Sequence, residues 1–206
     1  MKQKKLWAAL GFLAVFILWT MAVCHVDVQS VGPLGSRVGF AALNGFIHRM
    51  TGVHWDLYDL TDRLSLIPLG FIAGFGILGI VQWVRRKKLR LVDRSILVLG
   101  GFYLAVLAAF LFFEICPVNY RPVLIEGVLE ASYPSSTTML VLCVMAPAAM
   151  ELRSRIRNQA VTWVIAAFTV FMVVGRLLSG VHWFTDIVGG GLLSAGLVLL
   201  YDYFNS

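Results

Sequence analysis

Charged residues are scarce in this sequence: they make up 14% of its 206 positions, whereas hydrophobic residues make up 59%. A water-soluble domain of this length does not bury so much apolar surface, so the composition excludes an ordinary soluble protein. A chain that crosses the membrane several times fits the composition, because lipid covers its apolar side chains. The six Trp, six Tyr and fourteen Phe are typical of positions that face lipid or the membrane interface.

Cysteine is also scarce. The three that are present, Cys24, Cys116 and Cys143, form neither a disulfide framework nor the spacing of a metal site. We interpret them as free thiols in or near membrane spans, with a Cys24–Cys116 pair as the alternative. The carboxylates do not cluster either, so the sequence predicts no metal ion and no cofactor.

Basic residues are more frequent, and they give the chain a net charge of +6. A nucleic-acid partner would require them to form one basic stripe. Instead, twelve of the seventeen Lys and Arg lie in three short clusters between apolar segments, a pattern that marks cytoplasmic loops. The clusters are Lys2, Lys4 and Lys5; Arg85, Arg86, Lys87, Lys88, Arg90 and Arg94; and Arg153, Arg155 and Arg157. We therefore expect a membrane partner and no nucleic acid.

Six apolar segments alternate with these clusters and with loops on the other side. They cover residues 6–23, 66–84, 96–113, 135–150, 161–178 and 187–203. Their lengths predict an all-α bundle of six transmembrane helices in a single domain, residues 1–206. With six spans, the basic clusters and both termini lie on the cytoplasmic side of the plasma membrane. The first segment lacks a small-residue cleavage site, so we interpret it as a span and not as a signal peptide.

The loop between the first two spans, residues 24–65, is long and mildly amphipathic. Apolar residues recur at helical spacing across residues 35–50. This pattern predicts an interfacial helix on the outer side, with Asn44, His48 and Arg49 facing water or headgroups.

An arginine, a histidine and an aspartate lie between the last two apolar segments, at Arg176, His182 and Asp186. Polar and ionisable groups are costly so close to hydrocarbon and often mark functional sites. His182 and Asp186 are four residues apart, which places them on one face if the last apolar segment is helical from its start. A carboxylate in that position can orient an imidazole, and Arg176 suits a phosphate oxyanion.

Other polar residues lie at the outer ends of neighbouring spans. Arg121 belongs to the second outer loop, and Pro134 begins the fourth span just before Ser135 and Ser136. A helix N-terminus with free N–H groups binds anions. We therefore expect Arg121, the serines and Arg176 to surround a phosphate, with His182 either attacking phosphorus or acting as a base.

The spacing of these residues resembles that of the type-2 phosphatidate phosphatase family of integral-membrane lipid phosphatases. The third motif of that family is Ser-Arg, five residues, His, three residues, Asp. Here it reads Gly175-Arg176, five residues, His182, three residues, Asp186, so only the leading serine is replaced. The order of the motifs and the six-span frame match over most of the chain.

The first two motifs depart from the family pattern. The first is a Lys, six residues, then Arg-Pro, and here Glu114 precedes Arg121 and Pro122 in place of the Lys. The second is Pro-Ser-Gly-His, and here Ser136 and Thr137 replace its Gly and His.

The resemblance implies hydrolysis of a lipid phosphate or diphosphate at the outer membrane face, through a phosphohistidine on His182. Isoprenoid diphosphate, phosphatidylglycerophosphate and phosphatidate are candidate substrates. Asp186 would orient His182, while Arg121, Ser135 and Arg176 would bind the phosphoryl oxygens. The family His that protonates the leaving alkoxide is Thr137 here, and a hydroxyl is a poor acid near neutral pH.

Three accounts of the departures remain open. In the first, the enzyme uses another proton source, such as Glu114 or His54, or a leaving group that needs none. In the second, the protein is a weak or inactive relative that binds, transports or transfers a lipid phosphate. In the third, Thr137 is an engineered inactivating change.

Overall fold

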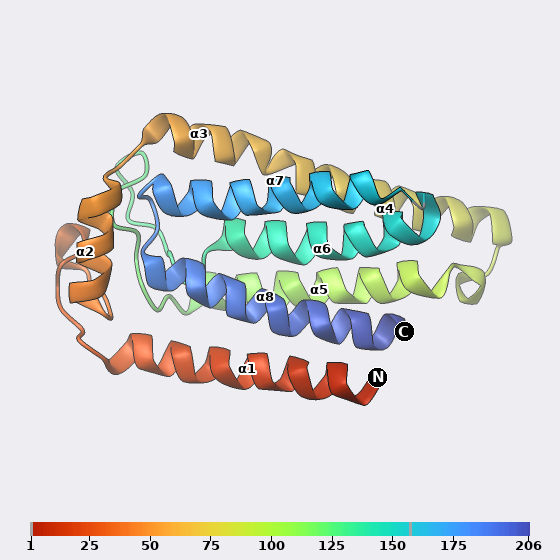
Figure 1. The fold of residues 1–206 in the computed structure, drawn as a ribbon, viewed down its shortest axis with the longest axis horizontal. Coiled ribbons are helices and arrows are strands. Elements are labelled where there is room, and N and C mark those ends of the chain that lie inside the picture. The colour runs from red at the N-terminus through yellow and green to blue at the C-terminus, as the bar shows by residue number, and fades with distance from the viewer. Residues whose placement is uncertain (1, 157) are drawn as a thin grey trace.

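The computed structural model describes residues 2–156 and 158–206. Over these residues the chain forms eight α-helices and two short 3-10 helices and contains no β-strand, only three isolated bridges. The helices are α1 Lys2–His25, α2 Ala41–Thr51, α3 Trp55–Leu64, α4 Leu66–Arg86, α5 Arg94–Ile115, α6 Ser136–Ile156, α7 Gln159–Leu178 and α8 Phe184–Asn205 (Figure 1). The 3-10 helices are η1 Pro33–Gly35 and η2 Leu89–Leu91.

Six helical segments are long and apolar enough to cross a membrane, which confirms the predicted all-α, six-span architecture. They are α1, the continuous pair α3–α4, α5, α6, α7 and α8. Several helices extend a few residues beyond the predicted apolar runs. Their ends carry Lys and Arg, whose stems can lie along apolar surface while their charges reach water.

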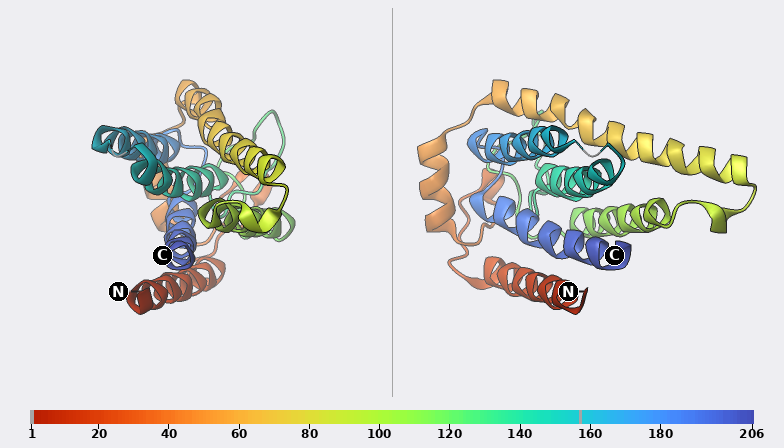
Figure 2. Two further views of the ribbon diagram at one scale, coloured as in Figure 1. Left: turned by 90° about the vertical axis from the view of Figure 1, so that its right-hand side faces the viewer. Right: turned by 45° about the vertical axis from the view of Figure 1, so that its right-hand side comes forward.

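The spans α6 and α8 form the centre of the bundle. About half of their apolar windows is buried, 56% and 50%, whereas the other four spans are buried by only 11–22%. Figure 2 shows α1 alongside α8, with α4, α5 and α7 around α6. The two central spans are also the ones that begin next to Ser135 and His182, so the candidate residues are held by the most buried part of the fold.

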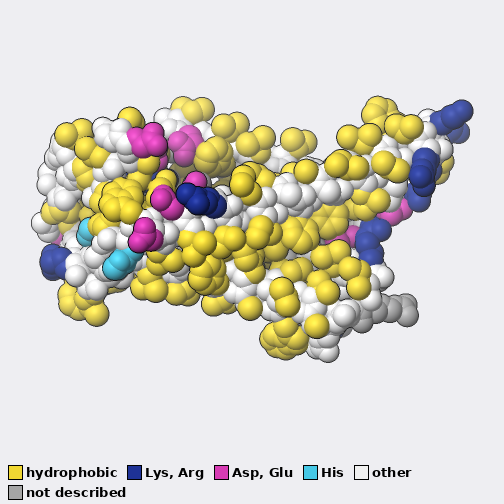
Figure 3. All heavy atoms as spheres, turned by 90° about the horizontal axis from the view of Figure 1, so that it is seen from above, with side chains coloured by type: hydrophobic (Ala, Val, Ile, Leu, Met, Phe, Trp, Pro, Cys, Tyr) yellow, Lys and Arg dark blue, Asp and Glu magenta, His cyan; other side chains and the backbone are white. Residues whose placement is uncertain are grey.

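The two ends of the bundle differ in charge. Both termini, the α4–α5 loop and the α6–α7 turn lie at one end, whereas α2 and the start of α3 lie at the other (Figure 1). Figure 3 shows most of the visible Lys and Arg at the first end, a broad hydrophobic band, and His and most acidic side chains towards the second end, where a few basic side chains also lie. The three basic clusters thus share one end, as the predicted topology requires; Arg157 lies outside the described residues.

The predicted interfacial helix is present as α2, but it begins at Ala41 and not near residue 35. Before it, Gln29 and Val38 exchange backbone hydrogen bonds of 3.1 and 2.9 Å, and Phe40 adopts a left-handed φ of 49°. The prediction that Asn44 faces water is wrong. Its side chain is fully buried and donates to the Gly39 carbonyl at 2.8 Å and to Thr185 Oγ1 at 2.9 Å, because α2 packs across the N-terminal end of α8.

Helix α3 was not expected, because residues 51–65 were interpreted as loop. Leu57, Leu60, Thr61 and Leu64 recur at helical spacing and could have indicated it. The helix continues through Ser65 into α4 and contacts the end of α7, where Arg176 lies.

Close packing between α8 and the segment before α6 yields a stability prediction. A Cβ atom at Gly189 would lie 2.5 Å from Tyr133 Cε2, whereas one at Gly191 would meet nothing within 4 Å. We expect Gly189→Ala to destabilise the protein by about 1–3 kcal/mol through overpacking. Gly191→Ala, the matched control on the same helix, should be neutral or stabilising by up to about 1 kcal/mol. Thermal unfolding in detergent measures both, and equal effects would contradict the packing argument.

Candidate active site

Asp186 lies in the first turn of α8 and is fully buried. The Trp183 backbone N–H donates to its Oδ2 at 3.0 Å, and Asn119 Nδ2 donates to its Oδ1 at 3.1 Å. The Ser132 hydroxyl also donates to Oδ2. These three donors come from two separate parts of the chain, so the carboxylate position is set by the tertiary fold.

A hairpin-like segment supplies two of those donors. The Ser132 backbone N–H donates to the Asn119 carbonyl at 2.9 Å, and the Arg121 N–H donates to the Glu130 carbonyl at 3.0 Å. This pairing brings Asn119 and Ser132 side by side at its base. It also places Arg121 next to them, and this residue is 8% exposed.

His182 lies in the turn between α7 and α8, where Gly180 adopts a φ of +70°. Its Nδ1 is 3.1 Å from Ser132 Oγ but 3.9 Å from Asp186 Oδ2, which is too long for a hydrogen bond. The expected proximity of carboxylate and imidazole is therefore present, with a serine hydroxyl between them. The other ring nitrogen, Nε2, is buried and has no hydrogen-bond partner among the described residues.

The environment of His182 favours a neutral ring. Burial lowers its pKa to about 4, and the positive charges of Arg121 and Arg176 act in the same direction against the opposing effect of Asp186. The ring is therefore unprotonated at neutral pH, which leaves one nitrogen lone pair available.

A titration can test this electrostatic environment directly. We expect His182 in the ligand-free protein to titrate near pH 4, below the ordinary value of 6.5, and to stay neutral as the pH falls through 6. NMR of protein labelled with ¹⁵N-histidine measures this, and the spectrum of His182→Ala assigns the signal. A midpoint at or above 6.5 would contradict the buried, cation-flanked site.

Arg121 is only partly paired. Its Nε lies 2.9 Å from Glu130 Oε2, while its Nη1 is buried without a hydrogen-bond partner in the described parts of the chain. A buried guanidinium nitrogen without a partner is costly and points to an anion that binds there.

Arg176, in the last turn of α7, is 2% exposed and is held by protein groups. Its Nε and Nη2 donate to Thr137 Oγ1 at 3.0 and 2.7 Å, and its Nη2 also lies 3.2 Å from Asp62 Oδ1. Its Nη1 donates to Thr61 Oγ1 at 3.2 Å and weakly to the Tyr58 carbonyl at 3.4 Å. An anion that binds Arg176 directly would have to replace one of these partners, and Asp62, 58% exposed, is the most accessible.

At the start of α6, Ser135 has a different environment from Ser136 and Thr137. Ser135 is fully buried, and its Oγ accepts a 3.4 Å hydrogen bond from the Thr138 N–H, so it caps the helix. Ser136 and Thr137 instead line a cavity that also contacts Arg121 and Arg176. The Thr137 hydroxyl is an acceptor from Arg176, which leaves its own hydrogen free to donate.

This cavity, of about 430 Å³, lies between α4, α5 and α6. Its polar end is formed by Asp62, Ser65, Arg121, Ser136, Thr137 and Arg176, and the rest of its lining is mainly apolar, including Leu69, Val106 and Phe110. The site thus joins a cationic end to an apolar chamber, which suits a ligand with a phosphate head and a hydrocarbon tail.

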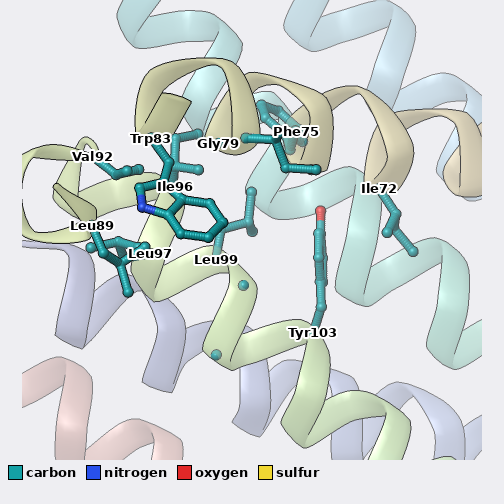
Figure 4. Close-up of a pocket in the computed structure, with 14 residues that line it drawn as sticks. Ile72, Phe75, Gly79, Trp83, Leu89, Val92, Ile96, Leu97, Leu99 and Tyr103 are labelled. Atoms are coloured by element: carbon teal, nitrogen blue, oxygen red, sulfur yellow. The ribbon is translucent and has the colours of Figure 1, made fainter. Parts of the chain in front are cut away.

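A second cavity lies further along α4 and α5. It is lined almost entirely by apolar residues of α4, η2 and α5, and it shares Ile72 and Tyr103 with the first (Figure 4). Figure 4 shows the Tyr103 hydroxyl directed from α5 towards α4. No charged side chain lines this second cavity, so we assign no chemistry to it.

Two predicted proton sources lie away from the cavity. Glu114 is exposed in the last turn of α5, and His54 is exposed with its Nε2 2.8 Å from the Thr51 carbonyl. Neither lines the cavity beside Arg121 and Thr137.

The side chains that sequence reasoning missed are Tyr58, Thr61, Asp62, Asn119 and Ser132. Asp62 had a signal in the periodicity of α3, whereas Asn119 and Ser132 are joined to Asp186 by tertiary packing alone.

No group of three or more His, Cys, Asp or Glu that could hold a metal occurs within residues 2–156 and 158–206. The three cysteines are free, so the alternative pairing of Cys24 with Cys116 is wrong in this structure.

The fold and the site together define a class of protein: a multi-pass helical membrane protein in which a buried His, Asp and Arg group adjoins an amphiphilic cavity. The chain belongs to the PAP2 superfamily, which it matches over residues 3–205. Its structure is similar to the crystal structure of a transmembrane PAP2-type phosphatidylglycerolphosphate phosphatase from Bacillus subtilis, with a TM-score of 0.64. That similarity covers 97% of this chain and 96% of the other at 19% sequence identity. A sequence comparison with curated proteins finds no match.

Proposed function

We propose that the protein hydrolyses a lipid phosphate or lipid diphosphate through a phosphohistidine on His182. The observation that carries the proposal is the unmet hydrogen-bonding capacity of the site. Arg121 Nη1, at the polar end of an otherwise apolar cavity, and His182 Nε2 are both buried without partners among the described residues. A phosphoryl group is an electrophile that His182 can attack and an anion that Arg121 can bind.

In the first step, His182 Nε2 attacks phosphorus, the P–N bond forms, and the P–O bond to the lipid breaks. Nδ1 keeps its hydrogen, so the phosphorylated ring becomes a cation near the Asp186 carboxylate. The departing oxygen takes a proton from the P–OH of a monoanionic phosphate or from water. In the second step, water attacks phosphorus, loses a proton to solvent, and releases inorganic phosphate and free His182.

The polar residues around the cavity have distinct roles in this proposal. Arg121 binds phosphoryl oxygens directly through its unpartnered Nη1. Arg176 donates to the Thr137 hydroxyl and stabilises the same negative charge through it. Arg176 binds the phosphoryl oxygens directly once they displace Asp62. Ser136 and the Thr137 hydroxyl donate to oxygens at the mouth, whereas Ser135 acts by capping α6.

The apolar cavities favour a substrate with a long hydrocarbon chain. The tail would lie between α4 and α5, starting near Phe110 and Leu69 and extending towards Ile72 and Tyr103. Phosphatidylglycerophosphate, phosphatidate and isoprenoid diphosphate all have this form. The solved relative is described as a phosphatidylglycerolphosphate phosphatase, which makes that lipid the first to test.

We further propose that the site faces the outside of the plasma membrane and that both termini are cytoplasmic. The turn between α7 and α8, which carries His182, lies at the end of the bundle opposite to the basic α4–α5 loop (Figure 1). Basic loops are retained on the cytoplasmic side, which supports this orientation.

A second function is favoured by the contacts of Arg176 and Thr137. Thr137 stands where the family has its proton-donating His, and it accepts two hydrogen bonds from the Arg176 guanidinium, while Asp62 and Glu130 each pair with an arginine of the site. These contacts suit a relative that binds, transports or transfers a lipid phosphate with little hydrolysis.

The test is release of inorganic phosphate by the purified protein from each of the three lipids in detergent micelles. Release from at least one lipid above a protein-free control supports hydrolysis. Binding of a lipid without release from any of them would overturn hydrolysis and support the second function. Phosphorylation of an added alcohol, without free phosphate, would instead indicate transfer.

A further inference from the structure

A serine hydroxyl lies between the imidazole and the carboxylate of the candidate site. Ser132 Oγ is 3.1 Å from His182 Nδ1 and donates to Asp186 Oδ2, whereas the two ionisable groups are 3.9 Å apart. We propose that Ser132 is a positioning residue that connects His182 to Asp186 and holds the imidazole in its nucleophilic tautomer. This inference rests on the proposed function and adds a residue outside its motifs.

The direction of each hydrogen bond follows from the atoms available. A hydroxyl has one hydrogen, and the carboxylate of Asp186 only accepts, so the Ser132 hydrogen points to Asp186. The Ser132 oxygen then accepts from His182 Nδ1–H. Because a neutral imidazole carries one hydrogen, Nε2 has none and presents its lone pair. This is the nitrogen that is buried without a partner.

Burial and backbone pairing hold Ser132, His182 and Asp186 in this arrangement. Ser132 is 3% exposed, His182 3% and Asp186 0%, so bulk water does not compete for the contacts. The backbone of Ser132 is paired with Asn119, whose side chain holds the other oxygen of Asp186 at 3.1 Å. Serine and carboxylate are thus fixed by the same hairpin base, and the imidazole is oriented against them.

The connection has a chemical consequence during the proposed reaction. When Nε2 forms its bond to phosphorus, the ring gains a positive charge and Nδ1 keeps its hydrogen. Ser132 continues to accept a hydrogen bond from His182 Nδ1–H and to donate one to Asp186. The Asp186 charge thereby polarises the hydroxyl that stabilises the positively charged ring. No proton has to leave the ring, and the same hydrogen bonds are restored when water releases the phosphate.

The test combines kinetics with the tautomer of His182. Ser132→Ala should lower kcat about 10²-fold, because the imidazole is no longer oriented for attack, with a smaller change in KM. ¹⁵N NMR at neutral pH should show Nδ1–H in the wild-type protein and a shift towards Nε2–H in Ser132→Ala. Ser132→Thr, which keeps a hydroxyl, should recover most of both properties. Ser194 is also buried but lies on α8, so Ser194→Ala is the control for loss of a buried hydroxyl.

Three results would overturn the inference: an Nε2–H tautomer in the wild-type protein, an unchanged tautomer in Ser132→Ala, or a Ser132→Ala kcat within about twofold of wild type. The wild-type tautomer decides the matter if Ser132→Ala does not fold. It is also measurable in a protein that hydrolyses no lipid, so failure of this inference and failure of the proposed function are distinguishable.

Discussion

Replacing His182 by alanine should reduce phosphate release from the preferred lipid by several orders of magnitude. Loss of the covalent nucleophile lowers turnover by about 10⁶-fold in a well-studied hydrolase. The physical reason is that, among the described residues, His182 alone combines a nucleophilic atom that is buried and unpartnered with a position close enough to Arg121 and Arg176 to feel their charges. Phosphate release under saturating lipid measures the effect.

Two further measurements make this prediction specific. His25→Ala, at an exposed histidine at the end of α1, is the matched control and should release phosphate at the wild-type rate. Brief exposure to lipid labelled with ³²P should label the wild-type protein in an acid-labile form and leave His182→Ala unlabelled. Phosphate release by His182→Ala at the wild-type rate would eliminate it as the nucleophile.

Thr137→His should raise the rate of hydrolysis for a lipid phosphate monoester by about 10²–10⁴-fold, the usual contribution of a general acid. Thr137 lines the same cavity as Arg121 and Ser136, so an imidazole there can reach the leaving oxygen. A lipid diphosphate should gain much less, because phosphate leaves without protonation. Rates with phosphatidate and with an isoprenoid diphosphate measure this difference.

The contacts of Arg176 define the control for this substitution. Thr137→Ser retains a hydroxyl acceptor for Nε and Nη2 and should leave the rate within a few-fold of wild type. If Thr137→His accelerates neither substrate while Thr137→Ser is active, the missing acid does not limit the reaction. In that case another group protonates the leaving oxygen, and Asp62, which contacts Arg176 within the cavity, is the first to examine.

The membrane spans could be predicted because each depends on a local property of the chain. Long apolar runs between Lys and Arg clusters leave few alternatives to helices, since every backbone polar group in hydrocarbon must be paired within its own segment. Local reasoning was weaker where polarity and helix formation coincide. Helix α3 is polar enough to resemble a loop, and apolar spacing does not show that the pairing of Gln29 with Val38 delays the start of α2 to Ala41.

In the candidate site, too, some residues could be predicted from the local sequence and others could not. Arg176, His182 and Asp186 could be singled out because their spacing is short and their polarity is unusual between apolar segments. Their partners could not be, since Ser132 and Thr61 lie 54 and 115 residues away in sequence from the groups they contact. Glu114 was a candidate by motif position alone, and the end of α5 places it on the exposed surface.

By itself, then, the sequence determined the membrane class, the six spans and the identity of the polar residues at their ends, because composition and spacing act over a few helical turns. Only the tertiary structure decided how those residues are used. Packing of the 119–132 hairpin against the start of α8 inserts Ser132 between His182 and Asp186, and packing of α3 against α7 surrounds Arg176 with protein partners. Hydrogen bonds between distant segments depend on three-dimensional proximity, which no local pattern encodes.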